Sequence, residues 1–146
     1  MYGGRWNPRG AFGALYLNAD LRVAAANARA RHAGRAIKLF DLRPEARPEL
    51  VTVDVPTANF VDALSSEGVK ARGFAESFPF DVAWQSCQAI ARDAHEAGIA
   101  GVAARSNAEA TATTNVGQEL AVFEGINVSL RQRRAFEAWY PDPIPG

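Results

Sequence analysis

The sequence has little of the chemistry that marks secreted or membrane-inserted proteins. Among its 146 residues Cys87 is the one cysteine, so no disulfide can form within the chain. No apolar run approaches the roughly 20 residues that are needed to span a bilayer. The N-terminus also lacks the charged stretch followed by an apolar one that a secretory signal needs. These absences favour a cytoplasmic protein with no membrane partner.

The sequence also lacks an excess of charge of either sign. Sixteen basic side chains balance sixteen acidic ones, so no overall field attracts the molecule to nucleic acid or to an anionic membrane. Direct binding to nucleic acid is therefore not expected. The sequence does not decide between a monomer and an oligomer.

What is present is enough apolar material for one domain. With 48% hydrophobic residues, a chain of 146 residues can build one continuous core and has too little material for two. We therefore expect residues 1–146 to form a single domain. Only Met1 and Tyr2 stand before a GGRWNP stretch, which fits a domain that lacks an N-terminal segment.

The first half of the chain carries strand and helix patterns. Residues 11–18, AFGALYLN, predict a buried strand. Residues 19–32 are rich in Ala and Arg without Pro or Gly, and Asp20 is suited to cap a helix there. Residues 36–42 and 49–55 contain β-branched and aromatic residues and predict two further strands.

The second half shows one clear amphipathic helix, at residues 81–97. Its apolar residues recur at spacings of three, four and three, which predicts one buried face. They are Trp84, Cys87, Ala91 and Ala94. The remaining predictions are a short helix near 59–65, strands at 99–104 and 119–126, a mobile polar loop at 107–117 and a terminal helix at 128–140. Because helices and strands are mixed without regular alternation, we expect an α+β fold.

Residues 3–10, GGRWNPRG, admit two interpretations. Their glycines let the backbone approach a ligand closely, Arg5 can hold a phosphate through two parallel hydrogen bonds, and Trp6 offers an aromatic face. Together these features suit a nucleotide-binding loop. Alternatively, Asn7 and its neighbours form turns, Trp6 anchors the core and Arg5 is solvated. Glycine patterns of this kind are too weakly specific to decide.

Taken in order along the chain, four segments resemble the RES domain, a family named for an arginine, a glutamate and a serine. They are GGRWNPRGAFGALYLN, the Ala-rich helix after it, WQSCQAIARDAHEAGIAGVAARS and NVGQELAVFEG. The resemblance implies the fold of diphtheria-toxin-type ADP-ribosyltransferases, with mixed twisted sheets flanked by helices. It also implies the toxin of a bacterial toxin–antitoxin pair, with an Xre-type antitoxin as partner and NAD as a substrate rather than a resident cofactor.

The resemblance implies roles for individual residues. Arg5 matches the family arginine and is expected to contact the phosphates or ribose of NAD, with Trp6 beside it. Tyr16 matches a tyrosine that is expected to stack on the nicotinamide ring. Ser106 matches the family serine, which is expected to hold the substrate. From the residues alone, Tyr16 also fits a core position on a strand, and Ser106 fits a cap or turn.

The family glutamate is where this sequence departs from the pattern. The corresponding position in the helix at 19–32 holds Asn27, whose amide can hydrogen-bond a ribose hydroxyl but carries no charge. Breaking the nicotinamide bond builds positive charge on the ribose carbon, and a carboxylate stabilises that charge. Losing one such partner commonly costs on the order of a hundred- to a thousandfold in rate.

Three explanations for Asn27 stay open. The amide is an engineered inactivation, it marks a natural member that has lost activity, or another acid has taken over. Asp20, two helical turns before Asn27, and Glu119, in a QEL run, are the candidates for the third explanation. Their ordinary roles are those of a helix cap and of a solvated strand residue.

Other reactive side chains form no site in the sequence. His32 and His95 have no cysteine or carboxylate at metal-ligand spacing, so we expect both on the surface and predict no metal site. Cys87 is expected in the core. The RQRR run at 131–134 is expected on a solvated helix face rather than at a phosphate or antitoxin contact.

The leading hypothesis is an enzyme that cleaves the nicotinamide–ribose bond of NAD, by hydrolysis, phosphorolysis or ADP-ribosyl transfer. It requires Arg5, Tyr16, Asn27 and Ser106, which are distant in the chain, to line one cleft. The competing hypothesis is a catalytically inactive RES-like module that only binds a protein partner. A third is a plain structural α+β domain, which would leave the four residues scattered.

Overall fold

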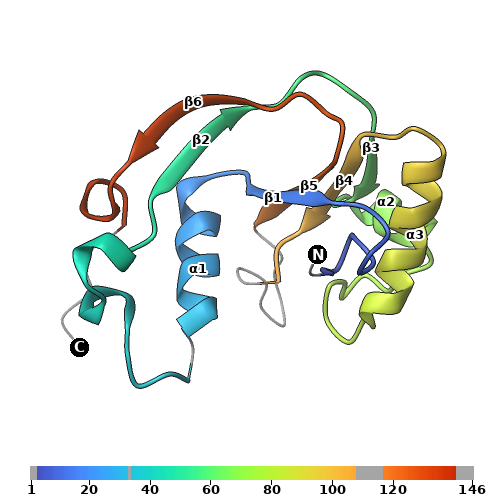
Figure 1. The fold of residues 1–146 in the computed structure, drawn as a ribbon. Coiled ribbons are helices and arrows are strands. Elements are labelled where there is room, and N and C mark those ends of the chain that lie inside the picture. The colour runs from blue at the N-terminus through green and yellow to red at the C-terminus, as the bar shows by residue number, and fades with distance from the viewer. Residues whose placement is uncertain (1–2, 33, 108–116, 141–146) are drawn as a thin grey trace.

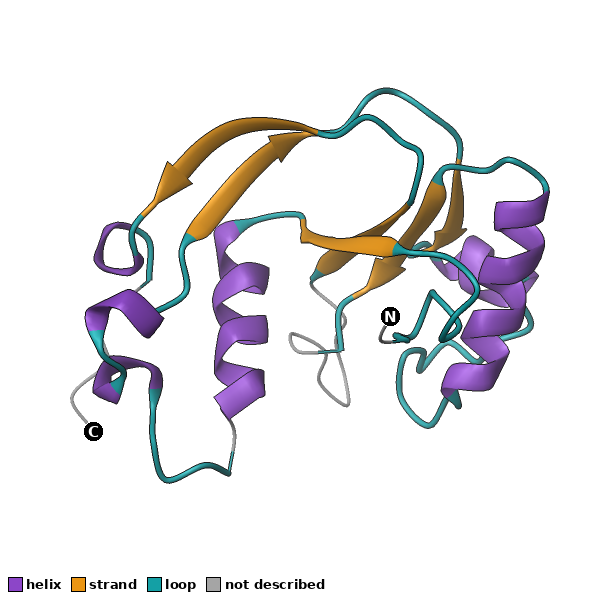
Figure 2. Ribbon diagram, in the orientation of Figure 1, coloured by secondary structure: helices purple, strands orange, loops and turns teal. Residues whose placement is uncertain are grey.

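Two sheets organise the chain (Figures 1 and 2). The computed structural model describes residues 3–32, 34–107 and 117–140. A four-stranded sheet has the order β1-β5-β4-β3, in which only β3 and β4 run parallel, and β2 and β6 form a separate antiparallel ribbon. The strands are β1 (Ala14–Asn18), β2 (Leu50–Asp54), β3 (Phe60–Ala63), β4 (Gly101–Arg105), β5 (Gln118–Phe123) and β6 (Ser129–Arg134).

Three α-helices accompany these sheets in the described residues. They are α1 (Leu21–His32), α2 (Ser66–Ala71) and α3 (Trp84–Glu96). The parallel strands β3 and β4 cannot be joined by a tight turn, and α2 and α3 make the crossover between them. Of the helices in the part of the chain that is described, none is long and apolar enough to cross a membrane. The α+β prediction is confirmed.

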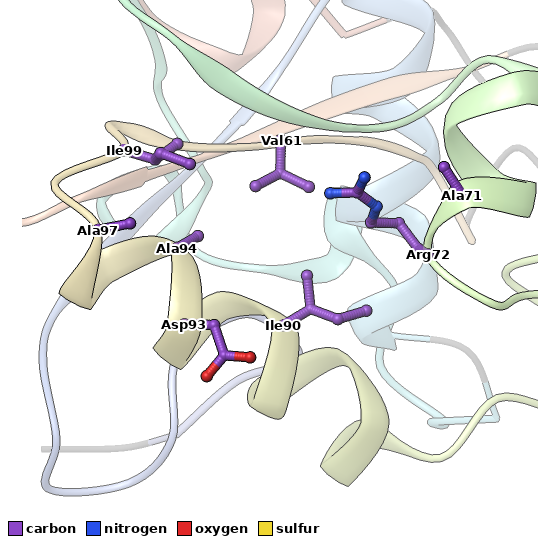
Figure 3. A pocket seen from close by; sticks show the side chains of 8 residues that line it. All are labelled: Val61, Ala71, Arg72, Ile90, Asp93, Ala94, Ala97 and Ile99. Carbon is purple, nitrogen blue, oxygen red and sulfur yellow. The ribbon is translucent and has the colours of Figure 1, made fainter.

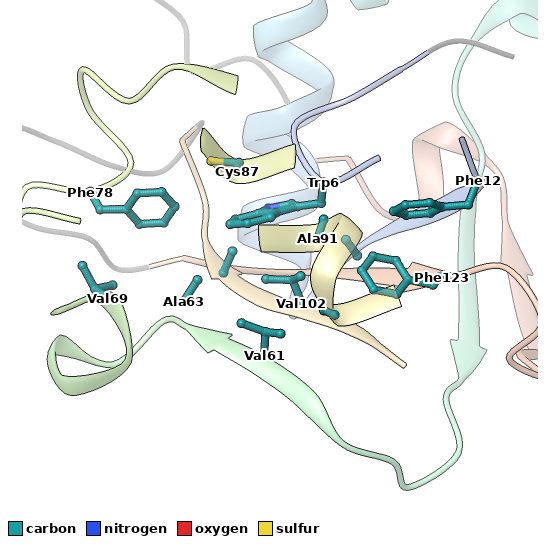
Figure 4. Packing of buried hydrophobic residues seen from close by; sticks show 13 residues of the cluster. Trp6, Phe12, Val61, Ala63, Val69, Phe78, Cys87, Ala91, Val102 and Phe123 are labelled. Atoms are coloured by element: carbon teal, nitrogen blue, oxygen red, sulfur yellow. The ribbon is translucent and has the colours of Figure 1, made fainter. Parts of the chain in front are cut away.

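The main core lies between the four-stranded sheet, α3 and the N-terminal loop. The ring of Trp6 is 2% exposed and lies among Cys87 and Ala91 of α3 and Val102 of β4 (Figure 4). Phe12 packs edge-on against Phe123 of β5, with 5.0 Å between ring centroids. The loop at 3–10 is therefore part of the core's structure, which fixes the position of the residues beside Trp6.

The ends of α1 and α3 follow the capping signals in the sequence. Asp20 Oδ1 accepts a hydrogen bond from Val23 N at 3.0 Å and so caps α1. Gly98 ends α3 with a φ of +76°, a left-handed conformation that favours glycine, and Gly98 N donates to the His95 carbonyl oxygen. The predicted strands at 11–18, 49–55, 99–104 and 119–126 are also confirmed, as β1, β2, β4 and β5.

Three predicted elements are wrong. Residues 36–42 contain a short 3₁₀ helix, Leu39–Asp41, because Asp41 Oδ2 accepts a hydrogen bond from Lys38 N at 2.9 Å and closes a turn. Residues 59–65 hold strand β3, which pairs with β4, and α2 begins only after Ser65. Residues 128–140 hold β6 and a 3₁₀ helix, Phe136–Ala138, instead of a terminal α-helix.

Burial also corrects the sequence-based expectations at several positions. Leu15 and Tyr16 of β1 are 47% and 41% exposed, so that strand is not fully buried. Trp84 is 52% exposed, although its spacing predicted the apolar face of α3. The RQRR run lies on β6, where Arg131 forms an exposed ion pair with Asp54 of β2 and Arg133 forms one with Glu49, directly before β2. Most of the predicted loop at 107–117 lies outside the described residues.

A buried arginine ties the end of β4 to the segment that crosses over to it. The Arg105 side chain is 7% exposed. Its guanidinium donates to the carbonyl oxygens of Leu64 (2.9 Å), Glu76 (2.6 Å) and Phe78 (3.2 Å), and also pairs with the Glu76 carboxylate. These bonds hold residues 64–78 against the strand that leads to Ser106.

Replacing Arg105 with alanine is expected to destabilise the fold, because three carbonyl oxygens lose their donor. We expect the free energy of unfolding in urea to fall by about 3 kcal/mol. The matched control is Arg131→Ala, which removes an exposed ion pair with Asp54 and should cost less than about 1 kcal/mol. Equal losses in the two variants would contradict the structural role of Arg105.

Candidate functional site

A pocket of about 240 Å³ lies where the N-terminal loop, β1, α1 and β5 meet. Its lining carries three aromatic side chains, a guanidinium, a carboxylate and two amides. The lining residues are Gly4, Arg5, Trp6, Tyr16, Asn27, Trp84, Asn107 and Glu119. Three of the four residues that the sequence analysis required to converge, Arg5, Tyr16 and Asn27, therefore lie in one cavity. The fourth, Ser106, is fully buried directly behind Glu119.

The N-terminal loop is closed on itself and on α3. Gly4 and Asn7 form a two-residue antiparallel bridge, with Gly4 N donating to the Asn7 carbonyl oxygen at 3.0 Å. Gln88 Nε2 of α3 donates to the Gly4 carbonyl oxygen at 2.8 Å. Two features of the second interpretation, the turns and the Trp6 anchor, are therefore present, whereas Arg5 is half-buried at the pocket rather than fully solvated. They hold Arg5 at the pocket.

The Tyr16 hydroxyl is the link between this loop and β1. It donates to Asn7 Oδ1 at 2.7 Å and accepts from Trp6 N at 2.9 Å. A Cβ on Gly4 would lie 2.5 Å from the hydroxyl oxygen, so glycine is needed for this close approach. Burial raises the pKa of the Tyr16 phenol above its ordinary 10.0, against a smaller lowering by the bond from Trp6 N. The ring thus has a fixed position at the pocket wall.

Glu119 on β5 is the carboxylate of the pocket. Its Oε1 accepts a hydrogen bond from Ser106 Oγ at 2.8 Å and a second from Asn27 Nδ2 at 3.0 Å. Asn27 Nδ2 also donates to Asn18 Oδ1 at 2.7 Å. Both hydrogens of the Asn27 amide therefore have acceptors, and one oxygen of Glu119 is held by donors from two different elements.

This arrangement explains why an amide suits position 27. A carboxylate there would face the Glu119 carboxylate at hydrogen-bond distance, and two like charges that close cannot both ionise without a large cost. The amide instead supplies a donor to Glu119. Asp20, the other candidate acid, serves as the cap of α1 and is absent from the pocket lining. The pocket therefore holds its acid on β5 and not on α1.

Arg5 gives the pocket its positive charge. Within the described residues no carboxylate forms an ion pair with its guanidinium, whereas Arg105 is fully bonded inside the fold. A half-buried guanidinium that lines a cavity is suited to bind phosphate or carboxylate oxygens of a ligand. Trp6 lines the same cavity, but its 2% exposure shows that its ring mainly packs in the core.

A second cavity, of about 340 Å³, lies between α2, α3 and β3 (Figure 3). Its lining is mostly apolar, with Arg72 and Asp93 as the charged side chains. None of the residues expected to bind a ligand lines it. We therefore assign the candidate site to the smaller, more polar pocket.

The remaining reactive residues lie away from the pocket lining or serve packing. Cys87 is fully buried in the core, as expected, and burial raises the pKa of its thiol. His95 was expected on the surface, but it is partly buried and stacks on Phe12 at a centroid distance of 4.1 Å. The side chain of His32 lies outside what the structure describes.

Comparison with known proteins gives two matches. The family model of the RES domain matches residues 1–127. The crystal structure of the M. tuberculosis MbcT–MbcA toxin–antitoxin complex contains a chain that matches with a TM-score of 0.70 at 23% sequence identity. That match covers 92% of this chain and 72% of the other, and it shows a common fold. No curated protein sequence matches this chain.

The signal for Glu119 was present in the sequence but weak. A lone glutamate on a strand is ordinarily solvated, and only its hydrogen bonds to Ser106 and Asn27 give it a special position. Asn18, which accepts from Asn27, and Trp84, which lines the pocket, carried no such signal, because the role of each depends on which elements pack side by side.

The Tyr16 phenol should make stability depend on alkaline pH. Because its pKa is raised in the folded state, its contribution is fully present below the ordinary pKa and is lost as the pH rises through the folded value. Urea unfolding across this range should show a smaller loss of stability for Tyr16→Phe than for the unmodified chain. An identical alkaline loss in both proteins would contradict this.

Proposed function

Because the chain belongs to the RES domain family, we propose that it is an enzyme that cleaves the nicotinamide–ribose bond of NAD. The observation that carries this proposal is the convergence of Arg5, Tyr16, Asn27 and Glu119 on one pocket, with Ser106 bonded to Glu119. In this proposal NAD is the substrate and no other cofactor is needed. The fold would be a variant of the ADP-ribosyltransferase fold.

The size of the pocket supports binding of one end of the dinucleotide within it. Its 240 Å³ lies below the roughly 300–1,000 Å³ of pockets that enclose a drug-sized ligand. The acid must lie beside the reacting ribose carbon, so the nicotinamide end belongs next to Glu119. Arg5 then holds the phosphates toward the mouth of the pocket, and the Tyr16 ring contacts the nicotinamide.

The proposed chemical step is heterolytic. The bond between the nicotinamide nitrogen and ribose C1′ breaks, and its electron pair leaves with neutral nicotinamide. C1′ develops positive charge, which the Glu119 carboxylate stabilises. An acceptor oxygen then bonds to C1′ and loses its proton. This step is common to water, phosphate and a protein side chain as acceptor, and product analysis distinguishes them as ADP-ribose, a phosphorylated ADP-ribose or a modified protein.

In this proposal Asn27 and Ser106 are positioning residues. Both donate to Oε1 of Glu119, which orients the carboxylate and leaves Oε2 for the substrate. Of the three explanations for the amide at position 27, this geometry supports the one in which another acid has taken over. The negative charge that the family glutamate would supply from position 27 would then come from Glu119 on β5.

We also propose that the protein is the toxin of a toxin–antitoxin pair and binds an antitoxin. The family and the fold shared with a chain of the MbcT–MbcA complex support this. The competing function is an inactive module that only binds such a partner, and the observation that favours it is the missing family glutamate at Asn27. Release of nicotinamide by the unmodified chain would exclude that alternative.

Calorimetric titration with NAD tests the binding part of the proposal. Arg5→Ala should weaken binding by about 10- to 100-fold, because a charge-assisted hydrogen bond contributes about 1.5–3 kcal/mol. Arg9→Ala removes an exposed guanidinium of the same loop and should leave the affinity unchanged. Absence of NAD binding by the unmodified chain would overturn the proposed function.

Nicotinamide release tests the catalytic part. Glu119→Gln should lower kcat by about 100- to 1,000-fold with a much smaller rise in KM, because the lost charge acts mainly in the transition state. Asn27→Glu should lower activity as well, since it places a second carboxylate beside Glu119. The double variant Asn27→Glu/Glu119→Gln should recover part of the activity lost in Glu119→Gln. Higher activity in Asn27→Glu alone would place the acid on α1.

A further inference from the structure

Trp84 is the most exposed of the three aromatic residues that line the site pocket. It is the first residue of α3, lines the pocket and is 52% exposed. Cys87, Ala91 and Ala94, which share its apolar spacing, are buried in the core. Exposed apolar side chains are common singly, so the exposure of Trp84 alone does not indicate a ligand. Its surroundings do.

The helix that carries Trp84 is fastened to the loop that carries Arg5. Gln88 lies one turn after Trp84, and residues four apart share a face of a helix. Gln88 Nε2 donates to the Gly4 carbonyl oxygen at 2.8 Å. Trp84, which lines the pocket, therefore lies on the side of α3 that is fastened to this loop.

A second aromatic ring lines the same pocket. Tyr16 is 41% exposed, and its hydroxyl is bound by both Asn7 and Trp6 N. Its ring therefore keeps a fixed position without a ligand. The pocket thus presents two partly exposed aromatic rings together with the carboxylate of Glu119 and the guanidinium of Arg5.

This set of groups suits a flat cation joined to an anion. An indole is the most favourable aromatic partner of a cation, the Glu119 carboxylate adds negative charge nearby, and Arg5 can hold phosphate. A pyridinium ring attached to a ribose phosphate has this combination. A neutral base gains less from the indole and nothing from the carboxylate.

We propose that Trp84 is a binding residue that packs its indole on the cationic nicotinamide ring of NAD and gives the site its preference for the oxidised dinucleotide. The inference rests on the proposed function and adds a residue to it. It assigns to α3, the crossover helix of the fold, a direct part in substrate selection.

The test is calorimetric titration in a Glu119→Gln background, which slows consumption of the ligand. NAD and ADP-ribose, which lacks nicotinamide, are titrated into this parent chain and into its Trp84→Leu and Trp84→Phe variants. We expect Trp84→Leu to weaken NAD binding by about 3- to 30-fold and to leave ADP-ribose binding unchanged. Trp84→Phe should restore most of the affinity, because it keeps an aromatic face.

A control variant and fluorescence separate a binding role from a structural one. Gln85→Ala changes the neighbouring exposed residue and should leave the affinities for NAD and ADP-ribose unchanged. Neither Gln85→Ala nor Trp84→Leu should change the midpoint of thermal unfolding. NAD should quench the tryptophan emission of the parent chain, and Trp84→Phe should remove most of that quenching while Trp6 and Trp139 stay in place.

The outcomes are distinguishable. If the parent chain binds neither NAD nor ADP-ribose, the proposed function fails and this inference fails with it. If the parent binds NAD and Trp84→Leu binds it equally well, the inference alone is overturned. Equal weakening of NAD and ADP-ribose by Trp84→Leu would also overturn it, because the indole would then not be recognising nicotinamide.

Discussion

One carboxylate oxygen, Oε1 of Glu119, joins the parts of the candidate site. It accepts from Ser106, which follows β4, and from Asn27, in the middle of α1, while its own backbone lies in β5. The sheet alone would place Ser106 near Glu119, since β4 and β5 are neighbours. The bond from Asn27 is what brings the helix after β1 into the same pocket.

The position of this carboxylate is governed by charge. A second acid at hydrogen-bond distance from Glu119 would force one of the two to stay protonated. An amide opposite the acid avoids that cost and contributes a donor. Asn27 and Glu119 are thus complementary, and a change at either position alters what the other can do.

Local pattern predicted much of the fold and the outline of the site. Periodicity and caps predicted α1, α3 and four of the six described strands, and the family resemblance of residues 3–18 pointed to Arg5 and Tyr16. The errors arose where pairing with a distant segment decides the conformation. The sequence of β6, SLRQRR, has no apolar alternation, and it forms a strand because β2 pairs with it. Strand β3 has only four residues and is stabilised by its pairing with β4. Glu119 was hard to identify for the same reason, because its partners are 13 and 92 residues away.

Adjacent residues at the end of β4 serve different purposes. Arg105 bonds to the segment at 64–78, and Ser106 bonds to Glu119, so their side chains point in different directions, as alternation along an extended backbone requires. A slip of this strand by one residue would exchange the two directions. It would bury an unmatched guanidinium beside the pocket and leave the carbonyl groups of the crossover without their donor. Misregistered molecules would therefore be unstable and would lack the bond from Ser106 to Glu119, so a mispaired chain could not accumulate as a stable species.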